Sequence, residues 1–294
     1  MRSPSLAVAV LALFTLTFVG AAVAQAPQPS PGPLVQKIKG NLYFVRGGMA
    51  FGGFYIYDKG VIVIDAKMTP DGTKQTVAEI AKITPLPITH ILITHSDGDH
   101  VNGLTGYPPG AAILASEATK REMEEAFKDE KMAALRAYLP TQTFTKAFSL
   151  RIGNELIDLI PVGPAHTAGD TVIYFHDLKT AFAGDLAFVG RDPLIHRQKN
   201  GTSAGYAKAL ETMIALDADT YLSGHSEPLA KSDLQTILAS IREKQEKVGA
   251  MVKQGKTLAE VRAAFGIPEP AAATGGRGWP SLVEIIYLEL TEKK

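Results

Sequence analysis

The sequence contains no cysteine among its 294 residues. This absence excludes disulfide bonds, a thiolate nucleophile and thiolate metal ligands. A metal ion in this protein must therefore be bound by imidazole and carboxylate groups. The core, and any metal that it holds, must stabilise the fold without covalent cross-links.

The sequence also lacks net charge, since Lys+Arg and Asp+Glu both number 30, and no block of like charges occurs. No electrostatic field therefore favours nucleic acid or an anionic membrane surface. The hydrophobic fraction of 46 % and the charged fraction of 20 % are ordinary for a globular protein with a sizeable core. We expect a small-molecule substrate and no nucleic-acid partner.

The first residues have the pattern of an export signal. Arg2 precedes an apolar run at residues 6–19, and a small-residue motif ends at Ala24. The alternative is an uncleaved anchor, but the run is short for a bilayer span of about 20 residues. We therefore expect a signal peptide at 1–24, a proline-rich linker at 25–33, and a periplasmic or secreted protein without stable membrane insertion.

The remaining pattern mixes strands and helices within one expected domain, residues 34–294. Alternating and apolar runs predict strands at residues 34–45, 54–57, 61–65, 88–94, 112–115, 144–150, 155–161, 171–176, 180–183 and 220–223. Helical periodicity and capping residues predict helices at residues 71–83, 116–138, 203–216, 232–252, 258–265 and 281–291, with a small-residue loop at 271–278. Two mixed sheets faced with helices fit this α/β order better than one doubly wound parallel sheet. The helices from about residue 232 onward either close one edge of the sandwich or form a dimer face.

One segment directly after an apolar strand concentrates groups of the metal-ligand type. Within six residues it holds His95, Asp97, Asp99 and His100. Such groups would repel one another and lose hydration without a cation. Gly98 lets the loop fold them around one point. The alternative is a polar turn with capping carboxylates.

Three later residues repeat one local order, in which an apolar strand is followed by a small residue and then by a ligand-type side chain. They are His166, Asp185 and His225. A lone histidine in such a place is often structural, but together the three favour a metal site over a polar turn.

The order of these motifs resembles the metallo-β-lactamase superfamily over roughly residues 34–230. The resemblance implies a four-layer αββα sandwich with two metal ions at one edge between the sheets. By position, the first metal would take His95, Asp97 and His166. The second would take Asp99, His100 and His225, with Asp185 bridging the two. Asp65, at the end of an apolar strand, matches the family's buried aspartate behind the ligands; alternatively it is a turn residue that ends the strand.

Asp97 departs from the family pattern, which usually has a second histidine at this position. An aspartate is a harder, negatively charged ligand, so the preference can shift from zinc toward iron or manganese. The flavodiiron proteins resemble this chain in having a carboxylate there and using iron. Zinc is the expected metal, with iron or manganese as alternatives; a further alternative is that Asp97 weakens the first site and only one metal binds.

The resemblance implies a hydrolase in which a metal-bound hydroxide, oriented by the ligand Asp99, attacks the substrate. The bridging aspartate and the lack of cysteine resemble the branches that cleave esters, thioesters, lactones or phosphodiesters more than the dedicated β-lactamases. A β-lactamase is the first alternative; a diiron redox protein and a non-catalytic metal-binding module are the others. Met49 and Phe51, in a glycine-rich turn, are a candidate substrate flap or an ordinary hairpin tip. His196 and Tyr206 are candidates to reach the pocket, but we interpret both as structural or surface residues.

Overall fold

A computed structural model describes residues 32–268 and 279–292. The expected signal peptide, all of the linker except residues 32 and 33, and the small-residue loop at 271–278 lie outside the described residues. In the described part, no helix is both long and apolar enough to span a bilayer.

The first sheet has seven strands in chain order. They are β1 (Leu34–Lys39), β2 (Leu42–Arg46), β3 (Gly52–Tyr57), β4 (Gly60–Ile64), β5 (Ile88–Leu92), β6 (Ala112–Ser116) and β7 (Gln142–Phe144). The strands β1 to β4 form an antiparallel meander, whereas β4 to β7 pair in parallel. Parallel pairing requires a crossover, and a helix supplies it between β4 and β5.

The second sheet has five strands in the order β12-β11-β10-β9-β8. They are β8 (Phe148–Ile152), β9 (Glu155–Pro161), β10 (Thr171–Phe175), β11 (Thr180–Gly184) and β12 (Thr220–Ser223). Only β11 and β12 pair in parallel. Both sheets are therefore mixed, as predicted.

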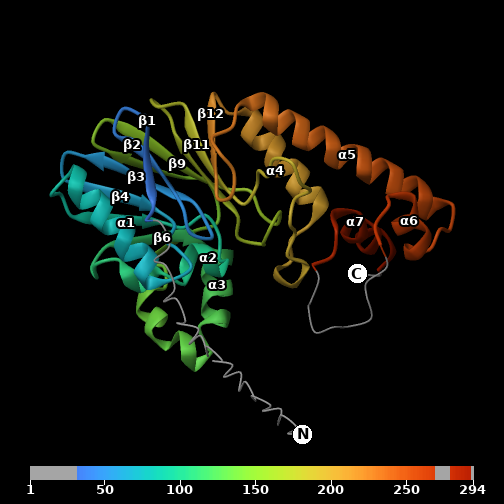
Figure 1. Cartoon of the computed structure of the whole chain (residues 1–294), viewed down its shortest axis with the longest axis horizontal. Helices are drawn as coiled ribbons and strands as arrows, with labels where there is room; N and C mark the ends of the chain where they lie inside the picture. Colours follow the sequence, from blue (N-terminus) through green and yellow to red (C-terminus); the bar gives the residue numbers. More distant parts are fainter. Residues whose placement is uncertain (1–31, 269–278, 293–294) are drawn as a thin grey trace, which may run out of the picture. The chain divides into compact units, whose positions relative to one another are not determined.

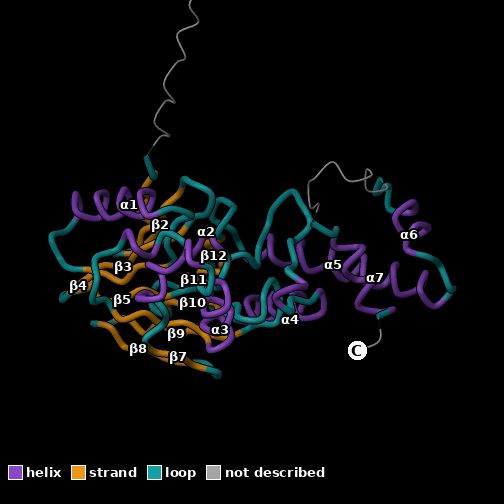
Figure 2. Tube along the Cα trace, turned by 90° about the horizontal axis from the view of Figure 1, so that it is seen from below, coloured by secondary structure: helices purple, strands orange, loops and turns teal. Residues whose placement is uncertain are grey.

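The helices of the first half of the chain lie beside the first sheet, and the later ones lie to one side of the strands (Figures 1 and 2). They are α1 (Pro70–Ile83), α2 (Gly98–Val101), α3 (Glu117–Ala126), α4 (Ser203–Ala215), α5 (Lys231–Lys253), α6 (Leu258–Ala264) and α7 (Leu282–Thr291). Three 3-10 helices join them, namely η1 (Leu104–Gly106), η2 (Glu130–Tyr138) and η3 (Arg197–Lys199).

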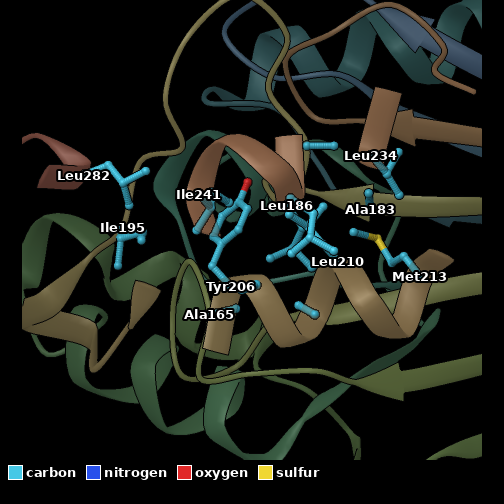
Figure 3. Close-up of a cluster of buried hydrophobic side chains, with 14 of the residues drawn as sticks. Ala165, Ala183, Leu186, Ile195, Tyr206, Leu210, Met213, Leu234, Ile241 and Leu282 are labelled. Atoms are coloured by element: carbon cyan, nitrogen blue, oxygen red, sulfur yellow. The ribbon is translucent and has the colours of Figure 1, made fainter. Parts of the chain in front are cut away.

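Three buried apolar clusters hold the four layers of helices and sheets together. One lies between the sheets and contains, for example, Phe44 and Ile62 of the first sheet and Phe175 of the second. Another joins the outer face of the first sheet to α1 and α3. The third joins the second sheet to α4, whose Tyr206 and Met213 point into it (Figure 3). The αββα sandwich predicted from the sequence is confirmed.

The C-terminal helices α5 and α7 belong to that third cluster and pack on α4. Figure 1 shows α4 to α7 together beside the strands. Within the chain α5 and α7 thus pack on α4, which covers the second sheet, and the dimer face stays the alternative prediction.

Three expected elements are wrong in their boundaries. The strand expected at 34–45 is the β1–β2 hairpin, because Gly40 adopts φ +51° and reverses the chain. The strand expected at 144–150 is two strands, β7 and β8, which belong to different sheets. The helix expected at 116–138 ends at Ala126. Asp129 then caps η2 by accepting a hydrogen bond from Lys131 N, and such local bonds compete with helix continuation.

Candidate metal centre

The carboxyl ends of four strands and the β9–β10 loop meet at one edge of the sandwich. β4 leads to Asp65, β5 to the segment at 95–100, β11 to Asp185 and β12 to His225. The parallel pairs β4–β5 and β11–β12 bring these ends to the same edge of each sheet. Thr171 N donates a hydrogen bond of 2.8 Å to Thr94 O and joins the two sheets at this edge.

The seven predicted ligands form two clusters, in each of which the ligand atoms lie within 4.8 Å of one another. The first contains His95, Asp97, His166 and Asp185, and the second contains Asp99, His100 and His225. Each can hold a metal ion, and the grouping is the one that the resemblance implied. Ligation itself stays a prediction.

Asp185 joins the two clusters through both of its carboxylate oxygens. Its Oδ1 lies 3.2 Å from His100 Nε2, and its Oδ2 lies 3.0 Å from His225 Nε2 and 3.9 Å from His95 Nε2. The side chain is only 4 % exposed. This position fits the bridging role predicted for it.

Asp65 lies behind the second cluster and is 2 % exposed. Its Oδ2 accepts hydrogen bonds from His100 Nδ1 at 2.8 Å and Thr94 Oγ1 at 2.7 Å. Its Oδ1 accepts one from Thr94 N at 2.7 Å. The residue is buried, and these three bonds support the orienting role, although Asp65, with φ +57°, also ends strand β4.

Three histidines are fixed through Nδ1, which leaves Nε2 directed into the site. Besides the His100–Asp65 bond, His166 Nδ1 donates to Leu194 O at 2.7 Å, and His95 Nδ1 lies 3.0 Å from Thr94 Oγ1. Because the Thr94 hydroxyl donates to Asp65, it accepts from His95. Such outer partners select the tautomer that ligates through Nε2.

A metal ion would supply the partner that several buried ligand atoms lack. Among the described residues, His95 Nε2, His100 Nε2 and Asp185 Oδ1 are buried and make no hydrogen bond. Leaving a buried polar atom without a partner is unfavourable by about 1–3 kcal/mol. A cation bound by these atoms would satisfy all three, and a set of imidazole and carboxylate groups suits zinc, iron or manganese.

The pKa shifts of Asp185 and His95 agree with a metal site, because they favour an ionised carboxylate and a neutral imidazole. Burial acts to raise the pKa of Asp185, but His100 and His225 outweigh it and hold that pKa well below its usual value. Burial, aided by His100, lowers the pKa of His95. A neutral His95 and an ionised Asp185 are the forms that bind metal.

The small residues before the ligands have a steric reason. A Cβ atom at Gly224 would lie within 2.7 Å of His100 Cε1 and closer still to Asp185 Oδ1. Gly184 adopts φ +52°, a conformation that favours glycine. Only glycine therefore lets these two strand ends pass so close to the clusters.

Comparison with known proteins agrees with this geometry. The profile of the Metallo-beta-lactamase superfamily matches residues 45–225, which is more than half of the chain. The chain belongs to this superfamily. Two solved metallo-β-lactamases share the fold, one from Pontibacter korlensis (TM-score 0.60, 18 % identity, 71 % of this chain and 99 % of that one) and one from Erythrobacter litoralis (TM-score 0.58, 17 % identity, 72 % and 96 %).

The superfamily members that are similar to this chain in sequence are named for different reactions. The 2,4-dinitroanisole O-demethylase subunit alpha of Nocardioides is 23 % identical over 70 % of this chain. The type 2 metallo-β-lactamase of Elizabethkingia meningoseptica is 27 % identical over 54 % of the chain and 68 % of its own length. A linear primary-alkylsulfatase of Pseudomonas is 22 % identical over 63 % of the chain. The match spans 61 % of the demethylase subunit and 43 % of the alkylsulfatase.

Asp97, the departure from the superfamily's usual motif, has neighbours that the sequence did not predict. Its Oδ1 pairs with Lys199 Nζ at 2.7 Å, and its Oδ2 lies 3.0 Å from His166 Nε2 and 2.9 Å from His196 Nε2. Burial acts to raise the pKa of Asp97, but His166 and the other nearby imidazoles outweigh it, so the carboxylate stays ionised.

His196 is not a surface residue, because its ring is buried and borders the first cluster. The signal that could have found it is local: the apolar pair Leu194-Ile195 precedes His196, much as apolar strands precede the predicted ligands. Tyr206 is structural, as interpreted: its ring is buried in α4 and its hydroxyl donates to Asp185 O at 3.0 Å.

The glycine-rich turn lies against the site and is held from both sides. Phe51 N donates to Gly224 O at 2.7 Å, beside His225, and the Phe51 ring packs edge-on against Phe44. Lys67 Nζ donates to the carbonyl oxygens of Val45, Gly47 and Ala50 at 3.1, 3.1 and 2.7 Å. Met49 is 62 % exposed at the tip. Met49 is thus the more exposed of the two candidate flap residues, and contact of either with a substrate stays a prediction.

Proposed function

We propose that this protein is a hydrolase that acts through two divalent metal ions. The observation that carries the proposal is the pair of clusters joined by Asp185, with buried ligand atoms that have no other partner among the described residues. When bound, two such ions lower the pKa of water from 15.7 toward about 7 and polarise the scissile group.

The residues have distinct tasks in this proposal. Asp185 holds both clusters together, and Asp65 fixes the orientation of His100. Asp99 is the most exposed carboxylate of the two clusters, with 16 % of its side chain accessible against 12 % for Asp97 and 4 % for Asp185. Its Oδ2 lies 3.3 Å from His225 Nε2. Asp99 is thus the carboxylate best placed to orient an attacking water.

We infer a substrate with an ester, thioester or lactone bond. Two superfamily relatives are named for reactions at an oxygen-linked group, an O-methyl group and an alkyl sulfate, which supports cleavage at oxygen. The relative named as a β-lactamase supports the alternative of cyclic amide hydrolysis. The proposal includes export through residues 1–24, a small-molecule substrate and zinc as the metal, with iron or manganese as alternatives.

Metal analysis combined with a hydrolysis screen tests the proposal. Wild-type protein and Asp97→His would be loaded with zinc, iron or manganese and assayed against ester, thioester, lactone, lactam and phosphodiester substrates. We expect two metal equivalents in the wild type and turnover of an oxygen-ester or lactone class. Asp97→His should change the metal preference toward zinc.

Three outcomes would contradict the proposal or part of it. Two irons with oxygen consumption would favour the redox alternative. Bound metal without turnover of any substrate in the panel would favour the non-catalytic module. Unchanged metal content and activity in Asp97→His would count against Asp97 as a ligand.

A further inference from the structure

We propose that His196 is an additional ligand of the first metal cluster and supplies, from the loop after β11, the imidazole that the motif lacks at Asp97. This inference rests on the proposed metal centre. It differs from the resemblance, in which the first ion takes only His95, Asp97, His166 and the bridging Asp185.

The first argument is the bonding state of the ring. His196 is 6 % exposed, and its Nε2 atom is buried. This atom lies 2.9 Å from Asp97 Oδ2 without the geometry of a hydrogen bond, and no other atom of the described residues bonds to it. A buried imidazole nitrogen without a partner is unfavourable unless something else binds it.

The second argument is that His196 shares this state with the predicted ligands. The described residues contain five buried side-chain atoms without a partner; apart from Arg46 Nε, on a guanidinium whose Nη1 bonds to Glu227, they are His95 Nε2, His100 Nε2, Asp185 Oδ1 and His196 Nε2. The first three are predicted metal ligands. The same physical explanation, a cation among these atoms, accounts for the fourth.

The third argument is position. The rings of His196 and His166 are edge to face, with centroids 4.6 Å apart. Around Asp97 Oδ2 lie three imidazole nitrogens, with His196 Nε2 at 2.9 Å, His166 Nε2 at 3.0 Å and His95 Nε2 at 3.8 Å. Three imidazoles thus converge on the side of the cluster where the usual motif would place its second histidine.

Neighbouring side chains fix the orientation of the His196 ring, as Asp65 fixes that of His100. His196 Nδ1 lies 2.9 Å from Gln198 Nε2; a half-turn of that amide would exchange the nitrogen for the oxygen, which could accept the Nδ1 proton and leave Nε2 to ligate. Trp279 packs edge-on against the ring, with centroids 4.5 Å apart. In the 3-10 turn η3, residues three apart lie on one side, so Lys199 reaches Asp97 from the same direction.

Lys199 compensates the negative charge that Asp97 brings to the place of the usual second histidine. Its ammonium holds Asp97 Oδ1 and also donates to Ser96 Oγ at 2.8 Å. Part of the carboxylate charge is thereby compensated. With His196 the first cluster offers three imidazoles, and a set rich in imidazole favours zinc over manganese.

Two substitutions separate a ligand from a residue that only positions Asp97. His196→Ala removes the ring. His196→Gln removes the imidazole but keeps an amide N–H that can donate to Asp97. His176→Gln is the matched control, because His176 Nε2 bonds to Asp158 at 2.7 Å away from the clusters. Zinc content after dialysis against a graded chelator series, and the visible spectrum of the cobalt-loaded protein, are measured for each variant.

If His196 is a ligand, both variants lose one of the two zinc ions at a chelator strength that the wild type and His176→Gln withstand. We expect at least a 10-fold weaker affinity and an altered cobalt spectrum in both. A wild-type affinity and spectrum in His196→Gln, with loss only in His196→Ala, would overturn the inference in favour of a positioning role. Wild-type behaviour of both would overturn it outright.

The proposed function fails separately, namely if the wild type itself does not hold two ions; the ligand role of His196 then falls with it. Circular dichroism of the metal-free variants checks that they fold. His196→Gln, which keeps most of the side-chain volume, decides the question if His196→Ala does not fold.

Discussion

Asp65 combines a backbone conformation and a charge that few residue types allow together. Its φ of +57° lies in the left-handed region, which aspartate and asparagine tolerate better than most side chains. Its carboxylate accepts three hydrogen bonds, one of them from His100. Replacing it with asparagine therefore removes the charge but keeps the backbone.

Asp65→Asn is expected to weaken metal binding at the second cluster by about 10–100-fold, the usual effect of losing the partner of a ligating histidine. One of the three donors would then face an amide N–H instead of an oxygen. Chelator competition measures the effect, with Asp58→Asn in the exposed β3–β4 turn as control. Equal affinity in the wild type and Asp65→Asn would show that the charge is not needed.

At the scale of elements, the glycine-rich turn depends on one buried lysine. Lys67 donates to three carbonyl oxygens of the β2–β3 connection, whose glycines leave it few side chains of its own to pack. Burial lowers the pKa of Lys67 to about 8, partly offset by Asp65. At neutral pH the ammonium still predominates and holds the turn beside the metal centre.

Lys67→Met should lower the free energy of unfolding by about 1–3 kcal/mol, because it leaves buried carbonyl oxygens without a donor. Urea denaturation measures this. Lys74→Met on the exposed side of α1, where the lysine is 64 % exposed, is the control and should change stability by at most about 0.5 kcal/mol. If both variants unfold alike, the turn does not depend on Lys67.

At the scale of the whole molecule, the sequence has no disulfides to stabilise the fold. Stability therefore depends on the positive groups that balance the negative carboxylates of the metal centre. In the metal-free protein, burial acts to lower the pKa of His166 and His225, but Asp97 and Asp185 in the first case, and Asp185 and Asp99 in the second, raise it to about 9. Protonated histidines thus take the place of a cation.

Metal-free protein should therefore become less stable as pH rises from 6.5 to 8. A folded-state pKa above the unfolded value of 6.5 contributes stability that is complete below 6.5 and is lost as pH rises through about 9. The window stops at pH 8 because deprotonation of Lys67 acts in the opposite direction above it. Thermal melts should show a shift of about 2–4 °C for each kcal/mol lost.

Zinc-loaded protein should show the opposite trend over the same range. Neutral imidazoles bind metal, so metal affinity rises with pH, and a ligand that binds only the folded state stabilises it in proportion to RT ln(1+[L]/Kd). Parallel pH profiles of the loaded and metal-free forms would contradict a metal at these histidines.

Much of the fold was predictable because periodicity and strand-end residues are local properties. The pattern predicted both mixed sheets and the sandwich, and its errors lay at junctions. No local property separates β7 from β8, since both contribute apolar residues, Phe144 and Ile152, to the cluster between the sheets. The division is decided by the strands with which they pair, β6 in one case and β9 in the other.

The sequence by itself determined the ligand types and the local order of strand, small residue and ligand that presents them. Gly184 and Gly224 belong to that order because close strand ends leave no room for a larger side chain. Only the tertiary structure decided that His196 and Lys199, about a hundred residues along the chain, surround Asp97. Such contacts depend on how loops from two sheets pack at one edge of the sandwich. No spacing within the sequence shows that His196 and Lys199 lie close to Asp97.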